Sequence, residues 1–175
     1  MNIRRKLIRN IVDKLISEAH CTRPPVDVEA IAERNKTVVH RRGVDENFSG
    51  YLIRNTAQSS GVIGVNSKHP LNRQRFTIAH ELGHFLLHGG NSVHIDKQFS
   101  VMRRDKDSSK GTSPQEMEAN LFAAELLIPE AFLARDMKEA GSFDLPEDDR
   151  VAELANKYQV SQQAMTIRLT TLGYL

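Results

Sequence analysis

Apolar residues recur at helical spacing near the amino terminus and predict an amphipathic helix over residues 2–20. Its apolar stripe comprises Ile3, Leu7, Ile8, Ile11, Val12, Leu15 and Ile16. The opposite face carries the charged residues Arg4, Arg5, Arg9, Asp13 and Lys14. A basic amphipathic helix can lie on a membrane surface. A charged face in contact with solvent is more common, so we expect this helix to pack on a core.

Shorter segments rich in β-branched residues follow a break at Arg23-Pro24-Pro25 and a short predicted helix over residues 26–35. Their pattern predicts strands at residues 37–40, 49–54 and 61–66. Polar turns separate these strands. Three short strands joined by turns are typical of a small antiparallel sheet.

The longest apolar stretch predicts a helix that begins at Pro70 and ends at Gly89-Gly90. It is apolar nearly all round, through Phe76, Ile78, Ala79, Leu82, Phe85, Leu86 and Leu87. A helix of this kind is buried in a core. The following residues 91–114 are polar and charged, and they are predicted to form a loop, either a lid beside this helix or a solvated connection.

A second helix has a clear start, with Ser113 as N-cap, Pro114 at the first helical position and Glu116 at the third. Its pattern continues to Leu127, before Pro129. Further helices are predicted over residues 130–140, 149–158 and 162–172, of which the last two resemble a helix-turn-helix. The chain therefore combines a small sheet with many helices.

Composition narrows the class of protein. The 175 residues suffice for one domain with a buried core and a small appendage. A net charge of +2 is too small to indicate nucleic acid or membrane binding by itself. The single cysteine, Cys21, excludes an internal disulfide and fits a reducing compartment. No apolar run is long enough to span a membrane and no signal peptide is apparent, so a cytoplasmic protein is expected.

The candidate chemistry lies in the central helix, which contains His80-Glu81-Leu82-Gly83-His84. Residues four apart lie on one helical face, so the two imidazoles can bind one metal ion from the same side. Glu81 projects beside them, where it can take a proton from a metal-bound water. This pattern is typical of zinc peptidases. Two hydrogen-bonded histidines in a buried helix are the structural alternative.

A catalytic zinc site usually has three protein ligands. The downstream candidates for the third ligand are His88, His94, Glu116, Glu118 and Glu125. Glu116 shares a helical face with Asn120 and with alanines that let two helices approach closely. We therefore favour Glu116, with Glu118 as its main rival, although Glu116 can instead be only a capping residue. Asn120 can bond the far nitrogen of a ligand histidine and fix its tautomer.

Residues 73–88 and 116–129, in this order, resemble the ImmA/IrrE family of metallo-endopeptidases. The segments Pro24-Pro25-Val26-Asp27 and Ser49-Gly50-Tyr51 also resemble that family, so the resemblance covers nearly the whole chain. It implies a gluzincin-like fold, Glu81 as general base, and zinc held by His80, His84 and Glu116. It also implies a bacterial or phage setting in which a helix-turn-helix repressor is cleaved to release transcription.

Together these patterns predict an α+β fold. In it, a small antiparallel three-stranded sheet packs on a mainly helical, zincin-like domain (residues 1–145), and helix-turn-helix-like helices (residues 146–175) pack on that domain. From Glu147 onward there are three basic and four acidic residues, a net charge of −1. This disfavours phosphate contacts, so we expect these helices to pack or to bind a partner without contacting DNA.

The expected function is a zinc-dependent endopeptidase, with Mn²⁺ as the other activating metal considered, that cleaves an Xre/Cro-type repressor. In this mechanism Glu81 passes the water proton to the leaving amine. An edge strand, either residues 49–54 or residues 61–66, would hold the substrate extended. The alternative function is a non-catalytic anti-repressor module that binds the repressor and has a structural or vestigial metal site.

The oxyanion of the reaction needs a further hydrogen-bond donor. His88, Arg75 and Tyr51 are the candidates. His88 lies one turn beyond His84, where it can instead interact with the carboxyl end of the helix. Arg75 can instead be a structural ion-pair partner.

Overall fold

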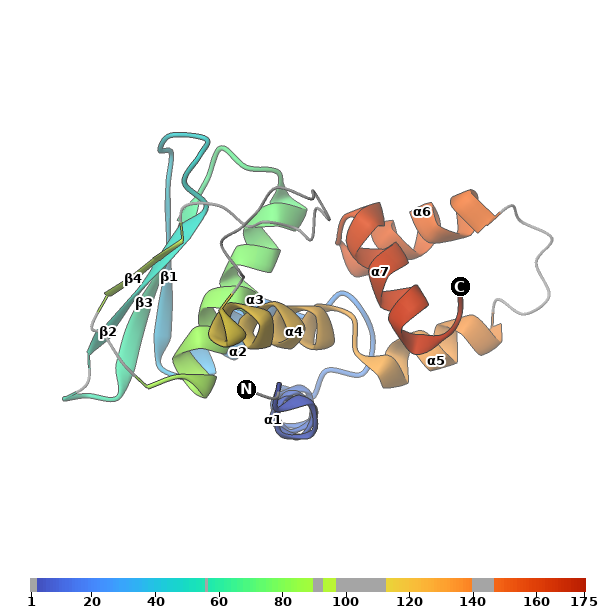
Figure 1. The fold of residues 1–175 in the computed structure, drawn as a ribbon, viewed down its shortest axis with the longest axis horizontal. Helices are drawn as coiled ribbons and strands as arrows, with labels where there is room; N and C mark the ends of the chain where they lie inside the picture. The colour runs from blue at the N-terminus through green and yellow to red at the C-terminus, as the bar shows by residue number, and fades with distance from the viewer. Residues whose placement is uncertain (1–2, 56, 90–92, 97–112, 140–146) are drawn as a thin grey trace.

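The computed structural model describes residues 3–55, 57–89, 93–96, 113–139 and 147–175. Within these residues, helices and strands follow in the order α1 (Arg5–Glu18), α2 (Val28–Arg34), β1 (Thr37–Arg42), β2 (Gly50–Asn55), β3 (Ser60–Asn66), α3 (Leu71–Leu87), β4 (Val93–Asp96), α4 (Pro114–Leu127), α5 (Glu130–Glu139), α6 (Glu147–Tyr158) and α7 (Gln162–Leu172). In Figure 1 the sheet lies at the left, α3 and α4 occupy the centre, and α5, α6 and α7 lie at the right. The predicted α+β class is confirmed.

The sheet differs from the prediction in its pairing. Its strand order is β1-β3-β2-β4. Strand β1 runs parallel to β3, whereas β2 is antiparallel to both β3 and β4. The antiparallel three-stranded sheet was therefore wrong, because the sheet is mixed and includes a fourth strand. Turn residues indicate where the chain reverses, and they correctly predict the β2–β3 hairpin. They do not determine which strand pairs with β1.

The fourth strand also changes which strands lie at the edges of the sheet. In the described part of the sheet, β1 and β4 are the edges, and β2 and β3 each pair on both sides. Neither segment predicted to bind substrate is therefore an edge strand. Strand β4 comes from the segment predicted to be a loop, which was wrong for residues 93–96, since pairing with β2 supplies their backbone partners. The rest of that prediction, over residues 97–112, lies outside the described residues.

Helix α3 lies between the sheet and α4 and carries more buried polar residues than any other described helix or strand. Its middle portion, from Thr77 to His84, is buried, as its apolar pattern predicts. Gly83 permits the close approach of α4, because a Cβ atom there would lie 3.0 Å from Cδ1 of Phe122. The polar motif from His80 to His84 therefore lies where α3 and α4 approach each other closely.

Helix α1 packs on the core through its apolar face. Ile8, Val12 and Leu15 are buried, so this face is occupied and the core-packing prediction is confirmed. The charged face remains at the surface. None of the helices in the described residues is both long and apolar enough to cross a membrane.

The C-terminal helices α6 and α7 are anchored to the rest of the protein by apolar and charged contacts. Met165 and Leu169 on α7 are buried. Beside them, Arg168 donates two hydrogen bonds to Glu125 of α4 and one to the carbonyl oxygen of Ile128. These contacts agree with helices packed on the larger domain. The boundary predicted at residues 145–146 stays a prediction and lies next to residues outside the described part.

Candidate metal centre

The two histidines of the central motif lie on the same face of α3 and point at one another. The Nε2 atoms of His80 and His84 are 3.0 Å apart, and both side chains are buried. This geometry follows from their spacing, which places the second imidazole one helical turn beyond the first. Two imidazole nitrogens therefore converge at one point between α3 and α4.

Glu116 joins this pair from the first turn of α4. Its carboxylate oxygens lie 3.1 Å from Nε2 of His84 and 3.3 Å from Nε2 of His80. The hydroxyl of Ser113 accepts the backbone N–H of Glu116, so the cap fixes the start of the helix while the Glu116 carboxylate turns toward the histidines. One ligand atom from each of the three residues lies within 4.8 Å of the others. The Glu116 side chain is 30% exposed, so solvent reaches the cluster from this side.

The electrostatic environment keeps Glu116 ionised. Burial alone would raise the pKa of its carboxyl, but hydrogen bonds and charge interactions with His80 and His84 outweigh burial and hold the pKa far below its ordinary value. A carboxylate in this state offers oxygen lone pairs and no proton. Glu116 can therefore act as an anionic ligand beside two imidazoles.

Asn120, one turn beyond Glu116 on α4, orients His80. Its side-chain oxygen lies 2.9 Å from Nδ1 of His80. An amide oxygen is an acceptor, so Nδ1 of His80 carries a proton, and its Nε2, beside His84 and Glu116, is the nitrogen that can offer a lone pair to a metal ion. This is the role predicted for Asn120.

A second chain of contacts reaches His84 from the other side. Nδ1 of His88 lies 3.2 Å from Nδ1 of His84, and Nε2 of His88 lies 3.1 Å from Oε2 of Glu118. Burial lowers the pKa of His88, although its hydrogen bond to Glu118 opposes this. Glu118 is bound in turn by Arg4 of the amino-terminal segment. Nothing in the sequence indicates the contact between Arg4 and Glu118, which lie 114 positions apart.

The rival candidates for the third ligand face other partners. Glu118 is bound by Arg4 and His88. Glu125 forms a buried ion pair with Arg168. The side chain of His94 lies outside the described part of the structure. Among Glu116, Glu118 and Glu125, the geometry therefore favours Glu116 as the third ligand.

Glu81 is fully buried and lies on the side of α3 that faces the sheet. A Cβ atom on Gly50 of β2 would lie 3.7 Å from Oε1 of Glu81, 2.4 Å from Cγ2 of Thr77 and 2.7 Å from the carbonyl oxygen of Gly64. Only glycine fits at this position without displacing α3. The absence of a side chain at residue 50 thus lets Glu81 lie between the sheet and the histidine pair.

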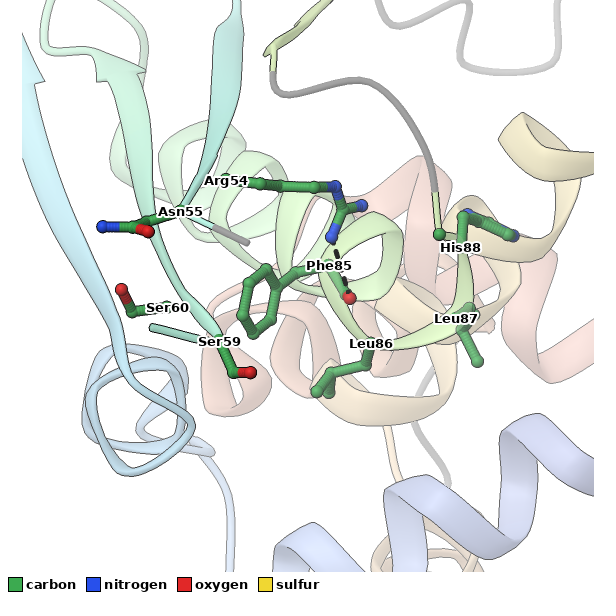
Figure 2. Close-up of a pocket in the computed structure, with 9 residues that line it drawn as sticks. Arg54, Asn55, Ser59, Ser60, Phe85, Leu86, Leu87 and His88 are labelled. Carbon is green, nitrogen blue, oxygen red and sulfur yellow. Dashed lines mark hydrogen bonds between the residues drawn. The ribbon is translucent and has the colours of Figure 1, made fainter. Parts of the chain in front are cut away.

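Arg54 of β2 holds the last turn of α3. Its guanidinium donates to the carbonyl oxygens of His84 and Phe85 in the last turn, where carbonyl groups lack some of their partners within the helix. Figure 2 shows this arginine and Phe85 in a pocket of about 350 Å³ whose wall also includes His88. Burial lowers the pKa of Arg54, and the charge of Glu81 opposes this. Arg54 therefore fixes the part of α3 that carries His84 and His88, a role that the sequence did not reveal.

Two of the predicted oxyanion donors, Arg75 and Tyr51, contact other parts of the protein. The guanidinium of Arg75 donates to the carbonyl oxygen of Val26, which is a structural contact but not the ion pair predicted as its alternative role. The ring of Tyr51 covers Gly64, whose added Cβ would lie 2.0 Å from Cε1 of Tyr51. Side chains alternate along a strand, so Tyr51 points away from α3 when Gly50 faces it. This orientation gives no support to the donor role predicted for Tyr51, which stays a prediction.

The residues present fit a zinc ion. Two imidazole nitrogens and one carboxylate oxygen are a ligand set that zinc takes in catalytic sites, whereas Mg²⁺ and Ca²⁺ prefer oxygen ligands alone. The far nitrogens of His80 and His84 both have neighbours that orient them, as is usual for metal-binding histidines. Glu116 is the most exposed of the three residues, with 30% of its side chain open to solvent.

Comparison with known proteins identifies the family of the chain. Residues 32–170 match the family described as the IrrE N-terminal-like domain, of peptidase family M78. The radiation response metalloprotease IrrE of Deinococcus radiodurans is 32% identical over 130 residues, which cover 73% of this chain and 37% of that protein. A transcriptional regulator of Mycobacterium tuberculosis superposes with a TM-score of 0.59 at 14% identity, covering 94% of this chain and 46% of its own. At such identity the second likeness supports the fold alone.

Proposed function

The chain belongs to the ImmA/IrrE family through its IrrE N-terminal-like domain, and we propose on this basis that it is a zinc-dependent endopeptidase. The observation that carries the proposal is the convergence of His80 Nε2, His84 Nε2 and the Glu116 carboxylate on one point. Glu81 precedes the second histidine by three positions and is buried at the same level of α3. The chain spans less than half the length of each relative compared, so its activity is inferred from this site.

In this mechanism His80, His84 and Glu116 hold the metal. When bound there, zinc supplies Lewis acidity, which polarises a peptide carbonyl and makes a water molecule acidic near neutral pH. Glu81 takes the proton of the attacking water and gives it to the leaving amine. Asn120 keeps the Nε2 lone pair of His80 directed at the metal position.

We propose that the substrate is a cytoplasmic helix-turn-helix repressor of the Xre/Cro type. The name of the Deinococcus relative, a radiation response metalloprotease, supports proteolysis in a stress response. The repressor itself is inferred from the family resemblance of the two motifs. Strand β4 lies at an edge of the described sheet, and an edge strand can bind an extended segment of such a substrate through its backbone.

The test is incubation of the zinc-loaded protein with the repressor encoded nearest to its gene, with the products identified by mass spectrometry. The wild type should cut the repressor at a defined bond. Glu81→Gln should bind both zinc and the repressor but leave the repressor intact, because an amide cannot accept the water proton. Glu33→Gln, an exposed change of the same kind on α2, is the matched control and should cleave like the wild type.

Two outcomes would contradict the proposal. If the Glu81→Gln protein cleaves as fast as the wild type, Glu81 is not the base. If neither protein cleaves the repressor but both bind it, the protein acts as an anti-repressor by binding. Repeating the assay with manganese in place of zinc shows whether cleavage requires zinc itself or proceeds with another divalent metal ion.

A further inference from the structure

We propose that His88 is a positioning residue for the metal centre: it accepts the Nδ1 proton of His84 and so directs Nε2 of His84 toward the metal position. Glu118 and Arg4 hold His88 in the required state, which makes the amino-terminal segment part of the site. The inference rests on the proposed metal site and adds a positioning role for residues that are not metal ligands themselves.

The first step is the contact between the two histidines. The Nδ1 atoms of His84 and His88 are 3.2 Å apart, and both side chains are nearly inaccessible to solvent. Two ring nitrogens at this distance form a hydrogen bond only when one carries a proton and the other a lone pair. The contact therefore admits two arrangements, and the partner of Nε2 on His88 decides between them.

That partner is the Glu118 carboxylate, whose Oε2 lies 3.1 Å from Nε2 of His88. The backbone N–H of Arg4 donates to Oε1 at 2.9 Å, and its guanidinium donates to both carboxylate oxygens. A carboxylate that accepts hydrogen bonds from a guanidinium and a backbone N–H acts only as an acceptor. Nε2 of neutral His88 must then carry the proton, which leaves the lone pair on Nδ1. The reverse arrangement would place the Nε2 lone pair of His88 against the carboxylate.

The consequence for His84 is a fixed tautomer. Since Nδ1 of His88 is an acceptor, Nδ1 of His84 carries a proton, and its Nε2, beside His80 and Glu116, is the nitrogen that offers a lone pair when a metal ion is bound. The two ligand histidines thus reach the same tautomer through separate partners. Asn120 on α4 sets His80, and His88 sets His84.

Arg4 extends this dependence to the start of α1. It donates to the carbonyl oxygen of Leu87 at 3.2 Å as well as to Glu118, so it joins α1, the end of α3 and α4 at one point. Arg4 lies outside residues 32–170, which carry the family match. The site therefore depends on a segment that precedes the matched domain.

The test compares zinc affinity by chelator competition for the wild type, His88→Phe and His88→Gln. Phenylalanine fills a similar space without an acceptor, and we expect zinc affinity to fall about 10–100-fold, as is typical when the partner of a metal-binding histidine is removed. Glutamine can accept from His84 with its oxygen and donate to Glu118 with its nitrogen, so His88→Gln should recover most of the affinity. Arg4→Gln should weaken binding less than His88→Phe.

Controls separate positioning from general loss of stability. His40→Gln removes an exposed histidine of β1, and Glu125→Gln breaks a buried ion pair on the same helix as Glu118; both should bind zinc like the wild type. Two-bond ¹H–¹⁵N correlation spectra of the metal-free wild type should show His84 protonated at Nδ1 and His88 protonated at Nε2.

Each result bears on a different claim. Equal zinc affinity of His88→Phe and the wild type, or an unprotonated Nδ1 of His84 in the metal-free wild type, would overturn the positioning role. An equal loss of affinity in Glu125→Gln would also overturn it, since the effect would then follow stability. If the wild type binds no zinc at all, the proposed function fails, whereas the spectra of the metal-free protein still test the tautomers.

Discussion

The buried ion pair between Arg168 and Glu125 should hold the C-terminal helices on α4. The Arg168 side chain is 3% exposed and that of Glu125 is 8% exposed, and their two hydrogen bonds measure 3.0 and 2.6 Å. Among the charged groups in the described part of the chain, Arg168→Met leaves Glu125 with Arg9, which is 3.6 Å away and half exposed. Removing one member of a buried pair costs about 3–5 kcal/mol because the other charge stays buried. The remaining contact with Arg9 places this variant near the lower limit.

Urea denaturation followed by circular dichroism measures this cost. A loss of about 3 kcal/mol corresponds to a fall in Tm of about 6–12 °C for a chain of this length. The double variant Glu125→Leu/Arg168→Met is the matched comparison, because an apolar pair leaves no buried charge, and it should be much more stable than the sum of the single changes predicts. A cost below about 0.5 kcal/mol for Arg168→Met, the range of ordinary surface changes, would refute the reasoning.

Three further predictions concern the site. Gly50→Ala should cost about 1–3 kcal/mol by overpacking, since its methyl group would lie 2.4 Å from a side chain of α3; Gly43→Ala, with contacts no closer than 3.5 Å, is its control in the same urea titration. Asn120→Ala should weaken zinc binding about 10–100-fold, because a ligand histidine loses its acceptor; unchanged affinity in chelator competition would contradict this. Glu118→Gln should destabilise the fold at neutral pH but little near pH 2, because hydrogen bonds from Arg4 lower the pKa of Glu118 from 4.5 to about 2.

The sign of the last prediction follows from linkage. A carboxyl whose pKa is lower in the folded state than in the unfolded state stabilises the fold above the unfolded pKa, and the stabilisation disappears as the pH falls through the folded pKa. The difference in unfolding free energy between the wild type and Glu118→Gln should therefore shrink as the pH falls from above 4.5 toward 2. A difference that does not change over this interval would contradict the ionised state of Glu118.

The part of the site that sequence could predict depends on helical periodicity. The four-residue spacing of His80 and His84 places both on one face, and the same spacing puts Glu116 and Asn120 on the face of α4 that meets them. These relations are local, because they need only the geometry of a single helix. The choice of Glu116 as a ligand stays a prediction that metal binding must test.

The missed features all depend on contacts between distant segments. The parallel pairing of β1 with β3 is set by packing, and no residue in either strand specifies it. The contact between Arg4 and Glu118 joins residues 114 positions apart, and the charged face of α1 gave no reason to single out Arg4. The sequence also did not show which face of β2 meets α3, so it did not reveal that Tyr51 lies on the face opposite to Gly50.

The most direct test of the central claim measures zinc content and proteolysis together in wild type and Glu81→Gln. After dialysis against a slight excess of zinc, both proteins should hold one zinc ion per chain by elemental analysis, and only the wild type should cleave the repressor. Glu116→Ala should lose the zinc, and Glu33→Gln should match the wild type in both measurements. Cleavage by a Glu81→Gln protein that holds its zinc, or full zinc content in Glu116→Ala, would contradict the account.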